Sequence, residues 1–556
     1  MKNVKIKSFS ITNICVGCTL CANKCPVQAI SGKLKEIHII DQEKCIRCGL
    51  CGRICPKGAV IDEKQNVVCK IDKSQWSVPY IKKDCAGCGL CIEVCPKNCL
   101  KISEPKYKGD IDTKAILEDE NNCIGCGICY DACPIDAINM HAKNEPIIER
   151  VKGVSRLYKI FCRTFQFVMK IGNYLLPYRM PEYIEGADSV LQLPKWIKEK
   201  GLDNVLLVTD NGLVKIGLHK PLIAEMEKEG IKYTLFSNIQ PNPTSDDVET
   251  GFKIFKEKNC DGLVAFGGGA PMDCAKAIGA RVARPNKSIS QMQGLMKVMR
   301  KIPIFFAVPT TSGTGSETTV AAVITDSKTH HKASINDIVL IPKYAVLDPL
   351  LTVGLPPFVT ATTGMDALCH AVEAYTNYTY LTKLEKKLAL ESIKLIYQNL
   401  LIVYNEADNI QARQNMQKAA FYAGRAFTRG CVGYVHAIGH TLGGLYGVPH
   451  GLAMAVILPH VMRQYGSAVY KRLAECADAC GIQGNGDKEK ALNFIAWMDE
   501  IKAKMGIPAG FDIIKEEDIP QIIKWASKEA NPLYPVPVIW SNDEFRLLLT
   551  TLKTAK

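Results

Sequence analysis

The sequence predicts a multi-domain chain of α/β plus α class: small cysteine-rich α+β modules, then a domain built on a parallel sheet, then an all-helical domain. Three observations support this order. Four near-copies of one cysteine run lie before residue 140, apolar strands alternate with helical stretches from about residue 200, and helical periodicity alone continues beyond about residue 355. At 556 residues, the chain is long enough for about three domains of ordinary size.

Composition indicates a folded protein in a reducing compartment. Hydrophobic residues make up 47% of the chain and charged residues 22%, which predicts a large buried core. The first residues, MKNVKIKSFSITNICVGC, lack the apolar run of a signal peptide, and no stretch approaches the roughly eighteen apolar residues of a membrane span. The spacing of many of the 25 cysteines favours metal clusters over disulfides. We expect a soluble, cytoplasmic protein that works under anaerobic conditions.

The formal net charge of +13 does not indicate a nucleic-acid-binding protein. A [4Fe-4S] core with four thiolates carries about −2, so four such cores would reduce the net charge to roughly +5. The sequence also has no stripe of Arg and Lys with interleaved aromatic residues. No nucleic-acid partner is expected.

Each cysteine run reads Cys-x2-Cys-x2-Cys-x3-Cys-Pro, and the copies are CVGCTLCANKCP, CIRCGLCGRICP, CAGCGLCIEVCP and CIGCGICYDACP. In this pattern, three thiolates bind one iron–sulfur cubane and the fourth binds the cubane of a paired run. Structural zinc is the alternative, but zinc sites use paired CxxC knuckles. The predicted ligand sets of four [4Fe-4S] clusters are Cys15, Cys18, Cys21 with Cys55; Cys45, Cys48, Cys51 with Cys25; Cys85, Cys88, Cys91 with Cys133; and Cys123, Cys126, Cys129 with Cys95.

These runs make residues 10–140 resemble a tandem of two bacterial two-cluster ferredoxins, a polyferredoxin of two ferredoxin-like modules at 1–70 and 71–145. Twenty-seven residues separate Cys95 from Cys123, against nineteen between Cys25 and Cys45, so an extra loop is expected in the second module. Cys69 and Cys99 lie outside the runs and are interpreted as buried thiols.

A basic amphipathic connecting segment follows at 146–180. Its stretch RLYKIFCRTFQFVMKIGNYLLPYRMP has apolar residues at helical spacing with Lys and Arg between them. Such a helix can lie on a membrane surface, but more often it packs on its own domain, and we favour the second interpretation.

An α/β domain is predicted at 181–355. NVLLVT, GLVAF, IPIFFAVP and YAVLD read as buried strands with helical stretches between them, which predicts a parallel sheet. The stretch GLVAFGGGAPMDCAKAIG places three glycines where a strand ends and a helix begins. Glycine lets the backbone approach a pyrophosphate closely, and the helix N-terminus then faces the negative charge.

The predicted helical domain at 356–556 holds a group of histidines. Five of the ten histidines in the chain lie between residues 370 and 460. Asp366 and His370 are four residues apart and so share one helix face, and VHAIGHTLGGLYGVPHG supplies His436, His440 and His450. Each buried histidine would need a polar partner, and a carboxylate with several histidines suits Fe(II) or Zn(II).

Residues from about 155 to 556 resemble the iron-containing (group III) alcohol dehydrogenases. The motifs that carry the resemblance are LLVTDNGL, GGGAPMDCAK, PTTSGTGSE, TGMDALCHAVEAY and VHAIGHTLGGLYGVPHG, in the family's order. The resemblance implies a Rossmann-like NAD-binding domain, a helical metal-binding domain of the kind shared with dehydroquinate synthase, and Fe(II), or alternatively zinc, in the cleft between them. The implied metal ligands are Asp366, His370, His436 and His450.

The resemblance also implies how NAD(H) is bound. Asp210 matches an acidic residue that faces the adenosine ribose, which favours NAD over NADP because a 2′-phosphate would be repelled. Ala270 stands where the family usually has serine, so one phosphate hydrogen bond is expected to be missing. His440 matches a non-ligand histidine near the nicotinamide and is the implied catalytic proton relay. The other implied cofactor contacts are Gly267, Gly268, Gly269, Asp273, Lys276, Thr310, Thr311 and Lys332.

The implied reaction is the metal-dependent, NAD(H)-dependent interconversion of a small alcohol and its aldehyde. The role of the clusters is open, because cubanes transfer single electrons whereas nicotinamide takes up hydride, and the sequence shows no flavin fingerprint. The clusters could link the dehydrogenase to a redox partner (a ferredoxin, a flavoprotein or another iron–sulfur protein) or serve as a docking and assembly module. Alternatively, the chain is a polyferredoxin electron carrier whose dehydrogenase half is a scaffold, although the intact motifs argue against this. The family commonly forms dimers or larger assemblies, so a homo-oligomer is expected.

Overall fold

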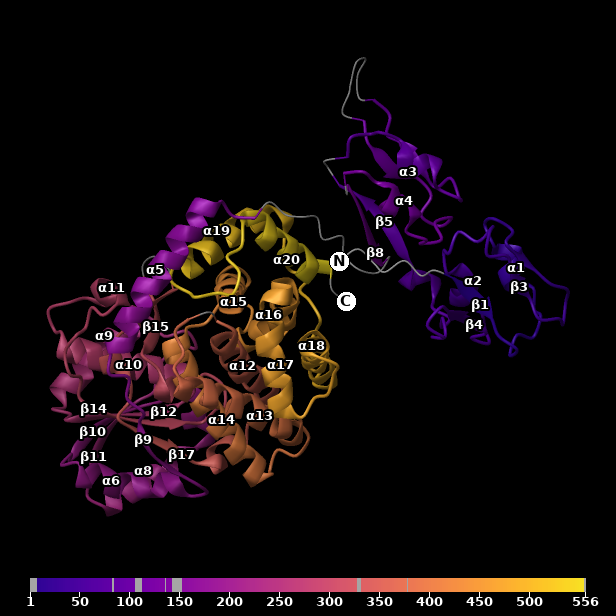
Figure 1. The fold of residues 1–556 in the computed structure, drawn as a ribbon. Coiled ribbons are helices and arrows are strands. Elements are labelled where there is room, and N and C mark those ends of the chain that lie inside the picture. The colour runs from indigo at the N-terminus through magenta and orange to yellow at the C-terminus, as the bar shows by residue number, and fades with distance from the viewer. Residues whose placement is uncertain are drawn as a thin grey trace. The chain divides into compact units, whose positions relative to one another are not determined.

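The computed structural model describes residues 8–82, 85–105, 113–135, 137–142, 153–327, 332–377 and 379–554. The chain divides into two compact units, Met1–Arg150 and Val151–Lys556 (Figure 1). Each unit is described by itself below.

The first unit contains the same small α+β module twice. In each module, the first and last strands along the chain form one antiparallel pair, and the two strands between them form another. Two short helices carry cysteines of the two runs. In the first module these are β1 (Phe9–Ile11) with β4 (Val60–Asp62), β2 (Ile30–Ser31) with β3 (Ile39–Ile40), α1 (Leu20–Lys24) and α2 (Leu50–Arg53). In the second they are β5 (Ser77–Ile81) with β8 (Ile138–Ala142), β6 (Leu100–Ile102) with β7 (Ala115–Leu117), α3 (Leu90–Glu93) and α4 (Ile128–Ala132).

Glycine starts three of the four short helices. Gly49, Gly89 and Gly127 precede α2, α3 and α4 with φ of 68°, 80° and 77°. This left-handed conformation costs glycine nothing and lets the chain turn sharply between the second and third cysteines of these three runs. The repeated glycine in the sequence therefore has a local structural reason.

One expectation about the extra cysteines is wrong. Cys69 is exposed, because at this residue the chain has already left β4, the last strand of the first module. Cys99 is buried as expected. The extra loop expected before Cys123 falls largely on residues 106–112, which lie outside the described residues.

The second unit begins with a long helix, α5 (Arg156–Leu175). It is fastened to its own unit, as favoured above: the Arg163 guanidinium donates to the carbonyls of Val536 and Pro537, at 2.9 Å each, and the Gln166 amide donates to those of Pro532 and Tyr534. The opposite, apolar face is exposed, with Leu157, Phe167, Ile171 and Leu175 among the exposed side chains. In the described residues, no helix is long and apolar enough to span a membrane.

A parallel six-stranded sheet forms the centre of the following α/β region, with the order β11-β10-β12-β14-β17-β9. The four predicted strands are confirmed as β10 (Asn204–Val208), β12 (Gly262–Gly267), β14 (Ile304–Pro309) and β17 (Tyr344–Leu347). The edge strands β9 (Glu182–Glu185) and β11 (Lys232–Phe236) were not predicted, because edge strands need fewer apolar residues. A small second sheet contains β13 (Gly294–Leu295), β16 (Lys332–Asn336) and β15 (Ala321–Thr325).

Helices cover both faces of the large sheet. Leu206 and Val208 of β10 pack with residues of α9 (Ser245–Glu257), α10 (Gly269–Ala283) and α11 (Ile289–Met292) on one face. Val205 and Leu207 pack on the other face with residues of α6 (Leu193–Glu199) and α8 (Lys220–Lys228). A fully buried parallel sheet of this kind explains why its central strands are continuous apolar runs.

Beyond residue 355 the described chain is helical, as predicted, and encloses the largest apolar core. Figure 1 shows these helices gathered beside the sheet. They are α12 (Pro357–Thr376), α13 (Lys383–Asn405), α14 (Ile410–Gly430), α15 (Tyr434–Tyr446), α16 (His450–Tyr465), α17 (Tyr470–Cys480), α18 (Asp487–Lys504), α19 (Ile519–Ala530) and α20 (Asn542–Thr554).

Candidate active site and cluster sites

The structure brings each predicted set of four cluster cysteines together. Three of the sets each line one hollow: Cys15, Cys18, Cys21 and Cys55 (site 1), Cys25, Cys45, Cys48 and Cys51 (site 2), and Cys95, Cys123, Cys126 and Cys129 (site 4). In the remaining set (site 3), the Cys91 thiol lies close enough to Cys85, Cys88 and Cys133 for negative charge on these sulfurs to raise its pKa. The last cysteine of each run thus joins the other run of its module, in the arrangement expected of paired cubanes.

The surroundings of these sulfurs suit thiolates bound to a metal cluster. Backbone N–H groups point at the last cysteine of three runs: Ala29 to Cys25 at 3.2 Å, Ala59 to Cys55 at 3.3 Å, and Ala137 to Cys133 at 3.1 Å. Such bonds stabilise negative charge on sulfur. Burial raises the pKa of the Cys51 thiol to about 12, so a thiolate there needs the positive charge of a metal.

Site 4 differs from the others by one buried thiol. Cys99 occupies the position held by Ala29, Ala59 and Ala137 in the other runs, and its Sγ lies 3.3 Å from Cys95 Sγ. This thiol touches a predicted cluster ligand, a contact that aligning the four runs could have suggested. Sequence reasoning identified its burial but not its position.

The predicted nucleotide-binding residues gather where the parallel strands end. Asp210 follows β10, Gly267, Gly268 and Gly269 join β12 to α10, and Thr310 and Thr311 follow β14, the next strand in the sheet. The carboxyl ends of adjacent parallel strands are where open α/β sheets bind their ligands. A Cβ atom on Gly267 would lie 2.6 Å from Pro271, so only glycine fits this turn.

Asp210 also shapes its own turn. Its carboxylate accepts a hydrogen bond from the Leu213 backbone N–H at 3.0 Å and so caps α7 (Asn211–Ile216). Lys332, on β16, donates to Asn242 at 3.0 Å. Both remain predicted cofactor contacts.

Two other predicted cofactor contacts are directed into the protein. Lys276 is fully buried and donates from Nζ to the hydroxyls of Ser316 and Thr319 at 2.9 and 2.7 Å, and to the Ala321 carbonyl at 2.9 Å. Asp273 accepts hydrogen bonds from the Ser316 hydroxyl and the Val323 backbone N–H. These two side chains hold the segment from Ser316 to Val323 against α10, a function that the sequence motif did not reveal.

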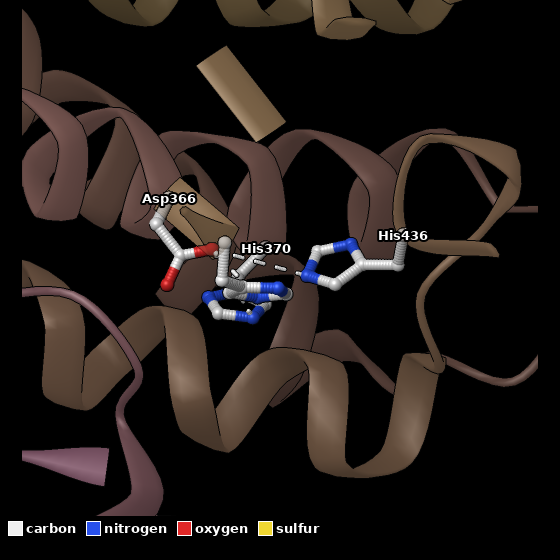
Figure 2. A group of neighbouring side chains, drawn as sticks. Asp366, His370 and His436 are labelled. Carbon is white, nitrogen blue, oxygen red and sulfur yellow. Dashed lines mark ion pairs between the residues drawn. The ribbon is translucent and has the colours of Figure 1, made fainter. Parts of the chain in front are cut away.

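The predicted metal ligands converge among the helices. Asp366 and His370 come from α12, His436 from α15, and His450 from the first residue of α16. Asp366 Oδ1 lies 3.4 Å from His450 Nε2, 3.9 Å from His370 Nε2 and 4.0 Å from His436 Nε2, and one ligand atom from each of the four residues falls within 4.8 Å of the others. Figure 2 shows Asp366 and His436 approaching each other beside His370.

The polarity of this centre fits a cation. Within the described residues, Asp366 Oδ1 and His436 Nε2 are buried without a hydrogen-bond partner. Burial lowers the pKa of His370 to about 3, so this imidazole is a neutral ligand at physiological pH. Burial alone would raise the pKa of Asp366, but the neighbouring His370 and His450 hold it below its ordinary value. An anionic carboxylate with neutral imidazoles is the donor set of Fe(II) or Zn(II).

Two carboxylates that sequence reasoning missed support the histidines. His436 Nδ1 donates to Glu373 at 2.6 Å, and His440 Nδ1 donates to Glu529 at 2.8 Å. Glu529 also accepts from the Tyr534 hydroxyl at 3.1 Å. Glu373 lies one helical turn after His370 and could have been found by helical spacing, whereas Glu529 is 89 residues from His440.

A glycine-rich turn at the carboxyl edge of a parallel sheet, together with a carboxylate and three histidines in a helical region, is the arrangement expected of a metal-dependent dehydrogenase. Comparison with known proteins agrees. Residues 181–349 match the family described as iron-containing alcohol dehydrogenase, and residues 360–551 match its C-terminal part. Residues 14–59 and 84–137 match one family described as 4Fe-4S dicluster domain, and residues 37–96 match a second family with the same description.

Similar proteins cover the second unit. The chain is 38% identical to alcohol dehydrogenase 4 of Schizosaccharomyces pombe, over 63% of this chain and 83% of that protein. It is 36% identical to the NAD-dependent methanol dehydrogenase of Bacillus methanolicus, over 64% of this chain and 93% of that protein. A solved structure of 1,3-propanediol oxidoreductase is 34% identical, with a TM-score of 0.65 over 68% of this chain and 100% of that one. The chain belongs to the iron-containing alcohol dehydrogenase family and carries 4Fe-4S dicluster domains at its N-terminus.

Proposed function

We propose that the second unit interconverts a small alcohol and its aldehyde with NAD(H) and iron, or alternatively zinc, and that four [4Fe-4S] clusters in the first unit exchange electrons with a redox protein. The observation that carries the catalytic half is the convergence of one donor atom each from Asp366, His370, His436 and His450 within 4.8 Å. The proposed place of action is the cytoplasm, and the proposed assembly is a homo-oligomer.

When bound, the metal supplies Lewis acidity toward the alcohol or aldehyde oxygen, and the nicotinamide supplies or accepts hydride. The side chains set the geometry for this exchange. Glu373 orients His436 through its 2.6 Å hydrogen bond, so Nε2 remains free to be a ligand. His440 is held by Glu529, which leaves its Nε2 to take up the alcohol proton or return it to the aldehyde oxygen.

The dinucleotide is proposed to bind along the carboxyl edge of the sheet. Gly268 and Gly269 let the pyrophosphate approach the start of α10, whose N-terminus favours negative charge. Asp210 is proposed to select NAD by repelling a 2′-phosphate. Asp273 and Lys276 are proposed to act by positioning the segment from Ser316 to Val323, and Lys332 by direct contact.

The proposed electron partner is a ferredoxin, a flavoprotein or another iron–sulfur protein. A polyferredoxin with a scaffold half is the weaker candidate, because a scaffold has no need of buried, unpartnered ligand atoms such as Asp366 Oδ1 and His436 Nε2 in the described helices. Anaerobically purified protein is expected to contain about sixteen cluster irons and one mononuclear metal per chain.

An anaerobic assay of NADH-dependent aldehyde reduction, with and without prior reduction of the clusters, tests both halves together. We expect activity in both states, because the proposed hydride transfer between nicotinamide and substrate does not pass through the clusters. Metal analysis and absorbance spectra of the same preparation check the cluster assignment, and about four equivalents of zinc without charge-transfer absorbance would contradict it. Loss of metal without loss of activity would contradict the catalytic assignment.

A further inference from the structure

The two modules of the first unit meet beside sites 2 and 4. Leu50, Trp76 and Ile124 form one buried apolar group, and Cys48 and Cys126 pack against it. Cys48 belongs to site 2 and Cys126 to site 4, so the two sites share this wall. The sequence left the spacing between the two pairs undetermined.

At this junction, the Arg53 side chain joins the backbone of the second cysteine run to the backbone of the fourth. Its guanidinium donates to the Cys48 carbonyl at 2.8 Å and to the Gly125 carbonyl at 3.4 Å, and it lies 5.3 Å from the centre of the Trp76 ring. Gly125 must be glycine, because its φ is 62° and a Cβ atom there would lie 2.4 Å from the Ser77 carbonyl oxygen. The junction is therefore closely packed.

The charge of Arg53 lies near thiols of both sites. The sulfurs with which its guanidinium interacts electrostatically are Cys48, Cys51, Cys123 and Cys126. At the same place in the other three runs, two residues before the last cysteine, the chain has Asn23, Glu93 and Asp131. Among the four runs, only the second has a cation at this place, and the fourth run, which meets it at the junction, has Asp131 there.

Sites 1 and 3 are the outer sites. Among the sixteen predicted ligands, Cys18 of site 1 and Cys88 of site 3 are exposed, while the cysteines of sites 2 and 4 are buried or half-buried. Exchange of the fourth ligand places site 1 beside site 2 and site 3 beside site 4.

We propose that the four sites form a single file in the order 1–2–4–3, in which Arg53 couples the modules and raises the reduction potentials of the two inner clusters above those of the outer two. A reduced cluster carries one more negative charge than an oxidised one, so a nearby cation stabilises the reduced state. Electrons then enter or leave at the exposed cysteines of sites 1 and 3 and are held on the inner pair. This inference rests on the proposed four-cluster content.

The test uses the full-length, anaerobically reconstituted protein and its Arg53→Ala and Arg53→Lys variants, with Lys64→Ala as a control that removes an exposed cation distant in sequence from every predicted ligand. Redox titration followed by electron paramagnetic resonance measures the potentials and the magnetic coupling between reduced clusters. In Arg53→Ala, we expect unchanged iron, two clusters shifted to lower potential and weaker coupling between modules. Arg53→Lys should restore the potentials, and Lys64→Ala should match the parent.

Several outcomes would overturn the inference. These are a parent with four clusters but no coupling between modules, or an Arg53→Ala protein that keeps all its iron and titrates like the parent. If Arg53→Ala loses clusters, Arg53→Gln replaces it, and potentials equal to the parent in that variant also overturn the inference. A parent with fewer than four clusters contradicts the proposed function itself and is recognised by its iron content.

Discussion

His440 and His450 stack with ring centroids 5.3 Å apart, yet their surroundings assign them different tasks. His450 Nε2 lies 3.4 Å from Asp366 Oδ1, whereas His440 Nδ1 is hydrogen-bonded to Glu529 at 2.8 Å. His436→Ala or His450→Ala should therefore remove the mononuclear metal and activity while leaving cluster iron unchanged.

His440→Ala should instead keep the metal and slow turnover by about 10²–10⁴-fold, the usual contribution of a general acid–base. Metal analysis and steady-state rates on the same preparations separate the two roles. Equal loss of metal in His440→Ala and His450→Ala would show that the division between ligand and relay is wrong.

The Asp210 carboxylate tests cofactor choice. Asp210→Gly should relax the preference toward NADP, because it removes negative charge from the proposed ribose position. Glycine is the suitable replacement, since it replaces an N-cap residue at a cost of only a few tenths of a kcal/mol. The ratio of kcat/KM for NADH and NADPH is the measurement, with Glu199→Gln as a charge-matched control elsewhere in the unit. An unchanged ratio would mean that Asp210 does not face the ribose.

The buried Cys99 thiol gives a third test at the scale of single residues. Cys99→Ala reproduces the residue that the other three runs have at this place and removes the thiol 3.3 Å from Cys95 Sγ. We expect unchanged iron and a lower potential for one cluster, because hydrogen bonds to sulfur stabilise the reduced state. The complementary variant, Ala59→Cys, adds a thiol at the matching position of the second run. Identical titrations of Cys99→Ala and the parent would contradict the expectation.

At the scale of elements, helix α5 is held by polar contacts and presents apolar residues to solvent. Arg163→Ala should leave the Val536 and Pro537 carbonyls without their partner, which costs about 1–3 kcal/mol. Faster hydrogen exchange of the amides of residues 156–175 is the expected result. Lys159→Ala, on the same helix but exposed, should exchange like the parent. Equal exchange in both variants would show that the contacts with residues 532–537 do not anchor the helix.

At the scale of the whole molecule, the two units have separate apolar cores, and the second contains all the residues proposed for dehydrogenase chemistry. Deletion of residues 1–150 should therefore leave NADH-dependent aldehyde reduction largely intact and abolish only partner-linked electron transfer. Rates with NADH and with a reduced electron donor measure the two reactions. A truncated protein that folds and binds metal but loses the NADH reaction would place the clusters in the catalytic cycle.

The sequence alone determined the class of each part. Fixed cysteine spacing predicted which thiols gather in each module, because three ligands of every set lie within seven consecutive residues. Continuous apolar runs predicted the four central strands, since strands buried on both faces have little polar surface. Helical spacing placed Asp366 and His370 on one face of α12.

Contacts between segments far apart in the chain could not be predicted from the sequence. The tertiary structure placed Glu529 on His440 across 89 residues, directed Lys276 into the protein, exposed Cys69, and brought Arg53 to Gly125 across 72 residues. Local patterns report periodicity and ligand spacing, whereas these contacts depend on how completed elements pack. The second partners of the histidines, and the contacts on which the proposed order of the cluster sites rests, therefore emerge only from the folded chain.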